Sequence, residues 1–276
     1  MKERHKLLRK PWISLIIYPI FATVVYVGII GGTLSLFMPK INIPGYDSNS
    51  IAGRLGLMTG GIIALLIHWF SFRKELAFGS WLRNIPKGLL LGMPLLVTAV
   101  LNLLSVDLSS VSRGLIITAF LESLAPAIHE EACFRVLPIS TAMWSMREEK
   151  KIPLILFLPA AVFALFHIGA GASPMNKFLS VLFALGLGLM NGVIYLRSGS
   201  FVPSMVYHLL INFTANLETV GAVSGTSAAN KANTVITIVI CIAYVVLAFF
   251  SVRPAVRPDI MNIWDRKIVE QPEQRK

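Results

Sequence analysis

The chain has 276 residues, of which 55% are hydrophobic and 14% charged, and its formal net charge is +11. With a mean hydropathy of +0.71, this composition excludes a soluble globular domain and indicates a polytopic membrane protein. We therefore predict an all-α fold with about eight transmembrane helices around a conical intramembrane cavity, in a single membrane domain that covers residues 1–276.

The apolar segments are long enough to cross a hydrocarbon core of about 30 Å, which requires about 20 helical residues. The first of them follows a basic N-terminal segment. A signal peptide has an apolar region of roughly 7–15 residues, so this longer run predicts a retained anchor helix. The predicted spans, in chain order, are residues 12–38, 51–71, 88–105, 113–134, 152–172, 178–196, 200–220 and 233–252.

Lysine and arginine residues that flank membrane spans stay on the cytoplasmic side. Placing both termini in the cytoplasm puts most basic residues there, Arg135 among them. The basic residues left on the other side are Lys40, Arg54, Arg113, Lys177 and Lys231. We therefore predict an integral membrane protein with both termini cytoplasmic, and its short loops and basic tail favour a bacterial plasma membrane. The positive charge then indicates contact with anionic lipids and gives no support to nucleic-acid binding.

The cysteine residues argue against two further classes of site. The chain has only Cys133 and Cys241, and both lie in or beside apolar segments, so neither a disulfide framework nor a pair of closely spaced cysteine ligands is available. Residues 129–135, HEEACFR, begin like the zinc-binding motif H-E-x-x-H, but Cys133 stands where the second histidine belongs. The interpretation of this segment therefore depends on residues elsewhere in the chain.

Polar side chains within the apolar spans are the strongest functional signal, because a charge in hydrocarbon costs at least about 2.5 kcal/mol. They fall into three sets on three predicted helices. The sets are Glu130, Glu131 and Arg135; His167; and His208 with Asn212. Together they offer two carboxylates, two imidazoles and an amide, and this inventory suits hydrolysis.

Helical spacing divides the paired glutamates between two tasks. Glu131 and Arg135 are four residues apart, so they share a helix face and can form an ion pair. Glu130 is turned about 100° from its neighbour and can face a different space. The sequence therefore predicts that Glu131 is neutralised by Arg135 while Glu130 remains free to act.

The other two sets show the same spacing. His208 and Asn212 can address a single ligand, and Phe163 stands one turn before His167 as an apolar wall. In chain order, the segments EEACFR, FALFH and HLLIN match the patterns E-E-x-x-x-R, F-x-x-x-H and H-x-x-x-N. This series resembles the intramembrane proteases of the type II CAAX prenyl endopeptidase and bacteriocin-processing family, the CPBP family. The resemblance covers residues 113–216, whereas the other spans match only in general character.

The resemblance implies an endopeptidase that cleaves membrane-associated protein or peptide substrates, with residues 113–216 as its catalytic core. Glu130 would activate a water molecule that His167 helps to hold. His208 and Asn212 would stabilise the developing oxyanion. The residues with implied supporting roles are Glu131, Arg135 and Phe163.

The sequence leaves the use of a metal open. Glu130, His167 and His208 could bind one Zn²⁺ with an open position for water, but the same groups can act without a metal. The prediction slightly favours a metal-free glutamate mechanism with no required cofactor over a metalloprotease.

Two other classes of function fit the same inventory. A non-catalytic scaffold or bacteriocin-immunity protein could keep the helix-pairing residues and lack turnover. A proton-coupled transporter could use the buried carboxylates and histidines as a proton relay. Among protease substrates, a bacterial origin favours leader-peptide or bacteriocin processing over a prenylated C-terminus.

The predicted spans contain one conflict in depth. Glu130 should lie within about 10 Å of the cytoplasmic edge of its span, whereas His167 should lie about 22 Å beyond Ile152. Straight helices along the membrane normal would keep these residues apart. We therefore expect residues 136–147 to form a separate short helix at the interface, with a displaced entry into the following span.

Overall fold

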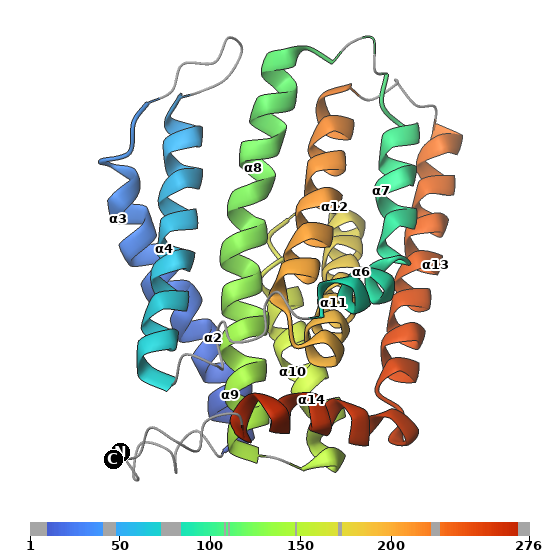
Figure 1. Cartoon of the computed structure of the whole chain (residues 1–276). Helices are drawn as coiled ribbons and strands as arrows, with labels where there is room; N and C mark the ends of the chain where they lie inside the picture. Colours follow the sequence, from blue (N-terminus) through green and yellow to red (C-terminus); the bar gives the residue numbers. More distant parts are fainter. Residues whose placement is uncertain are drawn as a thin grey trace.

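The computed structural model describes residues 10–40, 48–72, 84–107, 109, 111–146, 148–170, 173–221 and 227–269. Throughout these residues the secondary structure consists of helices joined by turns and loops, which confirms the predicted all-α fold. Most of the longer helices run side by side in one bundle, while α6 and α14 lie across its direction (Figure 1).

The N-terminal apolar run forms one helical segment, Ile13–Ser35. It comprises η1 (Ile13–Ile17), α2 (Tyr18–Phe21), η2 (Ala22–Gly31) and α3 (Gly32–Ser35), and η1 and η2 are π-helical. The segment packs against α4 (Ser48–Phe72). A Cβ on Gly31 would lie 2.7 Å from the carbonyl oxygen of Gly56, so the absence of a side chain permits this close helix crossing.

The predicted span 88–105 is broken into two helices. These are α6 (Ile85–Gly92) and α7 (Leu95–Leu104), which are bent by 58° at the intervening turn. Pro94 follows Met93 in that turn and cannot donate the backbone hydrogen bond that would continue α6. Tyr207 Oη donates to the carbonyl of Leu89 over 2.6 Å, which ties α6 to the helix carrying His208.

The helix with the paired glutamates is longer than predicted. After Ser112 caps its first turn by accepting from Leu115 N–H, α8 (Arg113–Glu131) leads into the π-helical turn η4 (Ala132–Val136) and then α9 (Leu137–Met146). The expectation of a separate short helix over 136–147 is therefore wrong, because these residues continue α8 without a break.

This continuity resolves the conflict in depth. Glu130 lies sixteen residues before Met146, and His167 lies fifteen residues after Ile152. At a rise of about 1.5 Å per residue, both therefore stand about 22–24 Å from the short connection between the two helices. The two side chains reach the same level of the bundle because the first helix extends a dozen residues beyond its predicted end.

The remaining helices complete the bundle. They are α10 (Ile152–Leu165), α11 (Pro174–Ser198), α12 (Phe201–Gly221), α13 (Ser227–Ser251) and α14 (Arg257–Val269), with short 3₁₀ turns at η5 (Glu149–Lys151) and η6 (Pro254–Val256). α10 ends at Leu165, well before the predicted limit of residue 172, and His167 follows in the turn. Gly199 ends α11 with φ of 71°, a conformation that glycine adopts without strain.

Four described helices are long and apolar enough to cross a membrane, and the bent pair α6–α7 would make a fifth. The four segments are Ile13–Ser35, Ile51–Phe70, Pro174–Ser198 and Thr234–Ser251. The helices α8 and α12 carry the polar motif residues, and α10 has only 14 residues. The structure thus supports an integral membrane protein, although the predicted number of about eight spans exceeds the number that meets these criteria.

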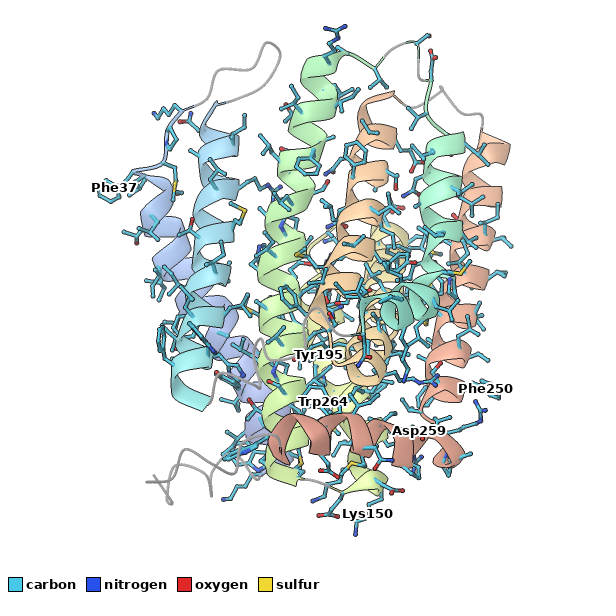
Figure 2. The ribbon with its side chains drawn as sticks, viewed as in Figure 1. Phe37, Lys150, Tyr195, Phe250, Asp259 and Trp264 are labelled. Atoms are coloured by element: carbon cyan, nitrogen blue, oxygen red, sulfur yellow. The ribbon has the colours of Figure 1, made fainter. Side chains whose placement is uncertain are left out.

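One end of the bundle carries the connection with Lys150 and the crosswise helix α14 (Figure 2). Trp264 on α14 is buried and donates its indole N–H to the carbonyl of Leu196 over 3.0 Å. Its ring also packs edge-on against Tyr195, with centroids 5.5 Å apart. Through these contacts α14 is fastened to the end of α11.

The assignment of Arg135 to the cytoplasmic basic residues is wrong. Arg135 is only 1% exposed and lies within the continuous helix that begins at Arg113. A residue in this position pairs with an acidic group inside the protein and carries no information about membrane orientation.

The crossing of α4 and α8 generates a first prediction. A Cβ on Gly61 would lie 2.6 Å from the Cα of His129, so we expect Gly61→Ala to force the two backbones apart. Overpacking of this kind costs about 1–3 kcal/mol, which should lower the thermal unfolding midpoint of the protein in detergent.

The matched control is Gly53→Ala in the same helix, where an added Cβ meets nothing within 4 Å. Alanine is favoured over glycine in a helix by about 0.5–1 kcal/mol, so this variant should unfold at the same temperature or higher. Equal midpoints for the two variants would contradict the proposed close crossing.

Candidate active site

The three sequence motifs meet around one cavity inside the bundle. Its volume is about 160 Å³, and α8, α10, α11, α12 and the turn after α10 contribute to its wall. The cavity is lined by Glu130, Phe163, His167, Ser180, Phe183, Ala184, Leu187, His208 and Asn212. All four residues predicted to be catalytic therefore contact the same space.

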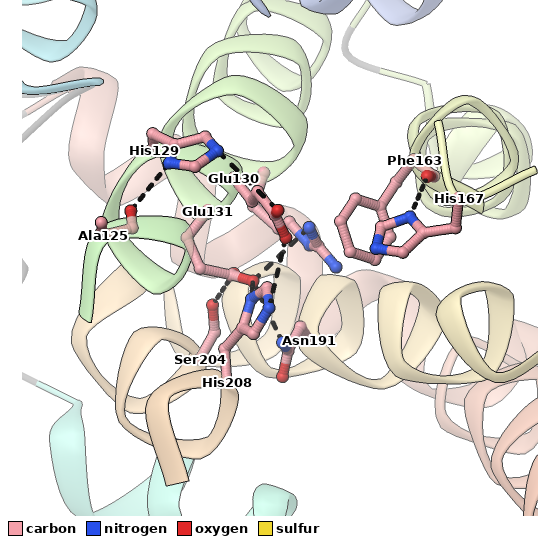
Figure 3. Close-up of polar contacts among 10 residues, drawn as sticks. Ala125, His129, Glu130, Glu131, Phe163, His167, Asn191, Ser204 and His208 are labelled. Atoms are coloured by element: carbon pink, nitrogen blue, oxygen red, sulfur yellow. Dashed lines mark hydrogen bonds and ion pairs between the residues drawn. The ribbon is translucent and has the colours of Figure 1, made fainter. Parts of the chain in front are cut away.

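Glu131 lies behind this cavity and is completely buried. Its Oε1 accepts hydrogen bonds from Asn191 Nδ2 over 3.0 Å and from His208 Nδ1 over 2.8 Å, while its Oε2 accepts from the hydroxyl of Ser204 (Figure 3). Each oxygen of the carboxylate is thus engaged by groups from α11 or α12. These bonds compensate for the removal of the charge from water.

Arg135 supplies the positive charge beside Glu131. Its Nη1 lies 3.4 Å from Glu131 Oε1, four residues away along the helix, as predicted. The guanidinium also stands 4.3 Å from the centre of the Phe163 ring, in a cation–π arrangement. Together Glu131 and Arg135 form a buried neutral pair that α10 covers from one side.

Glu130 faces the cavity, and its side chain is 19% exposed where that of Glu131 is 0% exposed. Its Oε2 lies 3.3 Å from His208 Nε2, and its Oε1 lies 3.8 Å from His129 Nε2. No arginine or lysine forms an ion pair with it in the described part of the chain. Glu130 is therefore the carboxylate of the pair that can meet water or a ligand.

His208 bridges the two glutamates. Its Nδ1 faces Glu131 and its Nε2 faces Glu130, and the ring is only 2% exposed. Since a neutral imidazole has a single N–H, it can donate to both carboxylates only when protonated. His208 thus links the buried pair to the cavity, and a proton on its ring can be shared with Glu130.

His167 lies across the cavity from Glu130 (Figure 3). Its Nδ1–H donates to the carbonyl of Phe163 over 2.9 Å, which leaves the lone pair on Nε2. The imidazole packs edge-on against the Phe163 ring, with centroids 4.6 Å apart. Phe163 therefore both orients His167 and contacts Arg135.

Asn212 also lines the cavity, one turn beyond His208 on α12. Among the described residues its side-chain amide has no hydrogen-bond partner, so its N–H groups can donate to a ligand. The expected convergence of His208 and Asn212 on one space is present, although both ring nitrogens of His208 are directed at glutamates.

Comparison with known proteins adds an independent finding. Residues 112–214 match the family described as type II CAAX prenyl endopeptidase Rce1-like. This segment is similar to the Rce1-like family. The match contains every residue of the three motifs and confirms the resemblance drawn from them. No curated protein and no solved structure matches the chain.

Three residues of the Rce1-like segment were missed as parts of the site. Ser204 precedes His208 by four residues, a spacing that places both on the face of α12 toward Glu131. Asn191 is an uncharged residue of α11, and its side-chain amide donates to Glu131. His129, which the motif does not include, is held by a hydrogen bond from Nδ1 to the carbonyl of Ala125 and faces Glu130.

The donor groups of the Rce1-like segment do not form a ready metal site. In the residues that the structure describes, no group of three or more His, Cys, Asp and Glu side chains is arranged to hold a metal ion. Both nitrogens of His208 face carboxylates, so the set Glu130, His167 and His208 would have to rearrange to coordinate Zn²⁺. The zinc site stays a prediction, and no step below depends on it.

The buried pair of the Rce1-like segment generates a second prediction. Glu131→Gln would leave the guanidinium of Arg135 buried without a counter-charge, a change that typically costs about 3–5 kcal/mol. Adding Arg135→Met removes the second charge and keeps an unbranched side chain against Phe163. We expect the double variant to be more stable than Glu131→Gln alone in chemical unfolding in detergent. An equally unstable double variant would show that charge pairing is not what Glu131 provides.

Proposed function

We propose that this protein is an intramembrane endopeptidase, which hydrolyses peptide bonds of membrane-associated protein or peptide substrates through a water molecule activated by Glu130. The observation that carries the proposal is the division between the glutamates. Glu131 is saturated by four partners, whereas Glu130 faces the cavity opposite the free Nε2 of His167. The match of residues 112–214 to the Rce1-like family supports peptide hydrolysis by this segment.

The first step is attack of water on the substrate carbonyl. Glu130 accepts one proton from the water while Nε2 of His167 accepts a hydrogen bond from the other. The water oxygen then bonds to the carbonyl carbon, and the carbonyl oxygen becomes an oxyanion. The amide of Asn212 lines the same cavity and would donate a hydrogen bond to that oxyanion.

The second step is expulsion of the amine. The tetrahedral intermediate collapses, the C–N bond breaks, and the leaving nitrogen takes a proton from Glu130. His208 lies 3.3 Å from Glu130 and supports this return of the proton, because its ring can donate to the carboxylate. The products are a carboxylic acid and an amine, and Glu130 returns to its ionised form.

Hydrolysis fits the polar groups better than proton-coupled transport. A relay needs titratable groups that continue across the protein. Here the series Glu130, His208 and Glu131 ends at Arg135, Asn191 and Ser204, which do not exchange protons readily. Among the described residues, the hydrogen bonds and ion pairs of the two glutamates thus converge on one cavity.

The central experiment is cleavage by the full-length protein in detergent. The peptide panel contains leader peptides with apolar flanks and peptides with a prenylated C-terminal cysteine, and products are identified by mass spectrometry. We expect Glu130→Gln and His167→Ala each to lower kcat/KM by about 10²-fold or more, because each removes a group that acts on the water. A metal-free mechanism also predicts that a chelator leaves cleavage unchanged.

Glu149→Gln is the matched control, since it makes the same chemical change on an exposed residue. It should cleave as the wild type does. Cleavage that survives in Glu130→Gln would refute the role of Glu130. If the wild type cleaves no peptide and Glu130→Gln keeps the full biological activity, the result would favour a scaffold or immunity protein.

A further inference from the structure

A second cavity adjoins the candidate active site. Its volume is about 290 Å³, and it lies among α7, α11, α12 and α13. Phe183 and Asn212 line both cavities, so the two spaces meet at these side chains. The other lining residues are Thr98, Leu101, Asn102, Ser105, Ile211, Ala215, Glu218, Ile236, Thr237 and Ile240.

The lining combines apolar side chains with hydroxyl and amide groups and one carboxylate. Ile211, Ile236 and Ile240 give it apolar surface. Asn102 is already engaged, because its amide donates to the hydroxyl of Thr214 over 3.1 Å. Glu218 is the sole acidic residue in the lining, and within the described residues its carboxylate has no ion pair or hydrogen bond. Half of the lining residues are polar, so a cavity of mixed character with a single unpaired carboxylate fits an extended peptide that carries one cationic side chain.

The two cavities follow one face of α12. Four residues at intervals of three or four along this face line the cavities. The first cavity is lined by His208 and Asn212, and the second by Asn212, Ala215 and Glu218. His208 and Glu218 are ten residues apart, which corresponds to about 15 Å along a helix. An extended peptide advances about 3.3 Å per residue, so four or five residues span this distance.

We propose that the second cavity binds the part of the substrate that flanks the scissile bond, with Glu218 pairing with a lysine or arginine four or five residues from that bond. This inference rests on the proposed peptidase function and adds a substrate class to it. Asn212 touches both spaces, so a chain bound beside Glu130 can continue directly into the second cavity. Because α12 ends opposite the end that carries α14, this flank of the substrate approaches from that opposite end (Figure 1).

Phe183 lies at the junction of the two spaces and narrows the passage between them. Its ring would limit the residue next to the scissile bond to a small side chain. Phe183→Ala would widen the passage between the two spaces. We therefore expect this variant to accept larger side chains next to the scissile bond. It should also accept the basic residue over a wider range of positions.

The test uses quenched fluorescent peptides in which a single lysine is moved from two to eight residues away from the cleaved bond, on either side. For the wild type, kcat/KM should be about tenfold higher when the lysine lies four or five residues away on one side. Glu218→Gln should remove this preference, and Glu218→Lys should transfer it to peptides with glutamate at that position. Asp107→Asn removes an exposed carboxylate outside both cavities and should keep the wild-type preference.

A binding measurement tests this inference independently of the proposed peptidase function. The same peptides are titrated by fluorescence anisotropy into the Glu130→Gln protein, with and without Glu218→Gln. Tighter binding of the favoured lysine peptide that disappears with Glu218→Gln supports the inference even where turnover is absent. Cleavage without any lysine preference overturns the inference and leaves the peptidase function standing. An amine-bearing lipid that copurifies with the wild type and is lost in Glu218→Gln assigns the cavity to lipid and also overturns it.

Discussion

The site depends on how one buried carboxylate is kept in place. An isolated charge at the position of Glu131 would be strongly disfavoured in the bundle. It is retained because Arg135 neutralises it and because Asn191, Ser204 and His208 donate hydrogen bonds to it. These partners belong to α8–η4, α11 and α12, so satisfying one charge fixes the relative positions of three helices. Glu130, the residue immediately before Glu131, is thereby placed at the cavity.

This arrangement explains why adjacent identical residues can have different tasks. Successive residues on a helix are turned about 100° apart, so one glutamate points into the packed helices and its neighbour points into open space. The buried glutamate, Glu131, holds helices together and is therefore not available to bind a ligand. The exposed member keeps access to water, and His208 connects the two through its opposite ring nitrogens.

The sequence was sufficient to predict the motif residues, because intramembrane charges and four-residue spacing are both visible without a structure. The pairing of Glu131 with Arg135 followed directly from that spacing. The position of Arg135 in the membrane did not, because a charged residue at the limit of an apolar run predicts the end of a span. The structure instead continues the helix to Met146, through the π-helical turn that contains Arg135. Buried serine, threonine and proline residues in 137–146 are satisfied by packing and by backbone carbonyls, which hydropathy alone does not register.

Residues that act through tertiary contacts were the hardest to predict. Asn191 and Ser204 carry no charge, and only the approach of α11 and α12 to α8 shows that both serve the same carboxylate. The second cavity was equally hidden, since its lining comes from four helices that are far apart in the sequence. Propensity and periodicity describe one helix at a time and cannot determine which faces will meet.

The attachment of α14 has a consequence for how the protein can be altered at its C-terminal end. Trp264 donates a hydrogen bond to the carbonyl of Leu196, and Leu196 lies on the same helix as Asn191 and Phe183. A rigid helix transmits a displacement at one end along its whole length, so a shift at Leu196 would move both Phe183, which lines the cavity, and Asn191, which holds Glu131 behind it. A fusion partner or a truncation that displaces α14 should therefore also displace α11 and the candidate active site beside it.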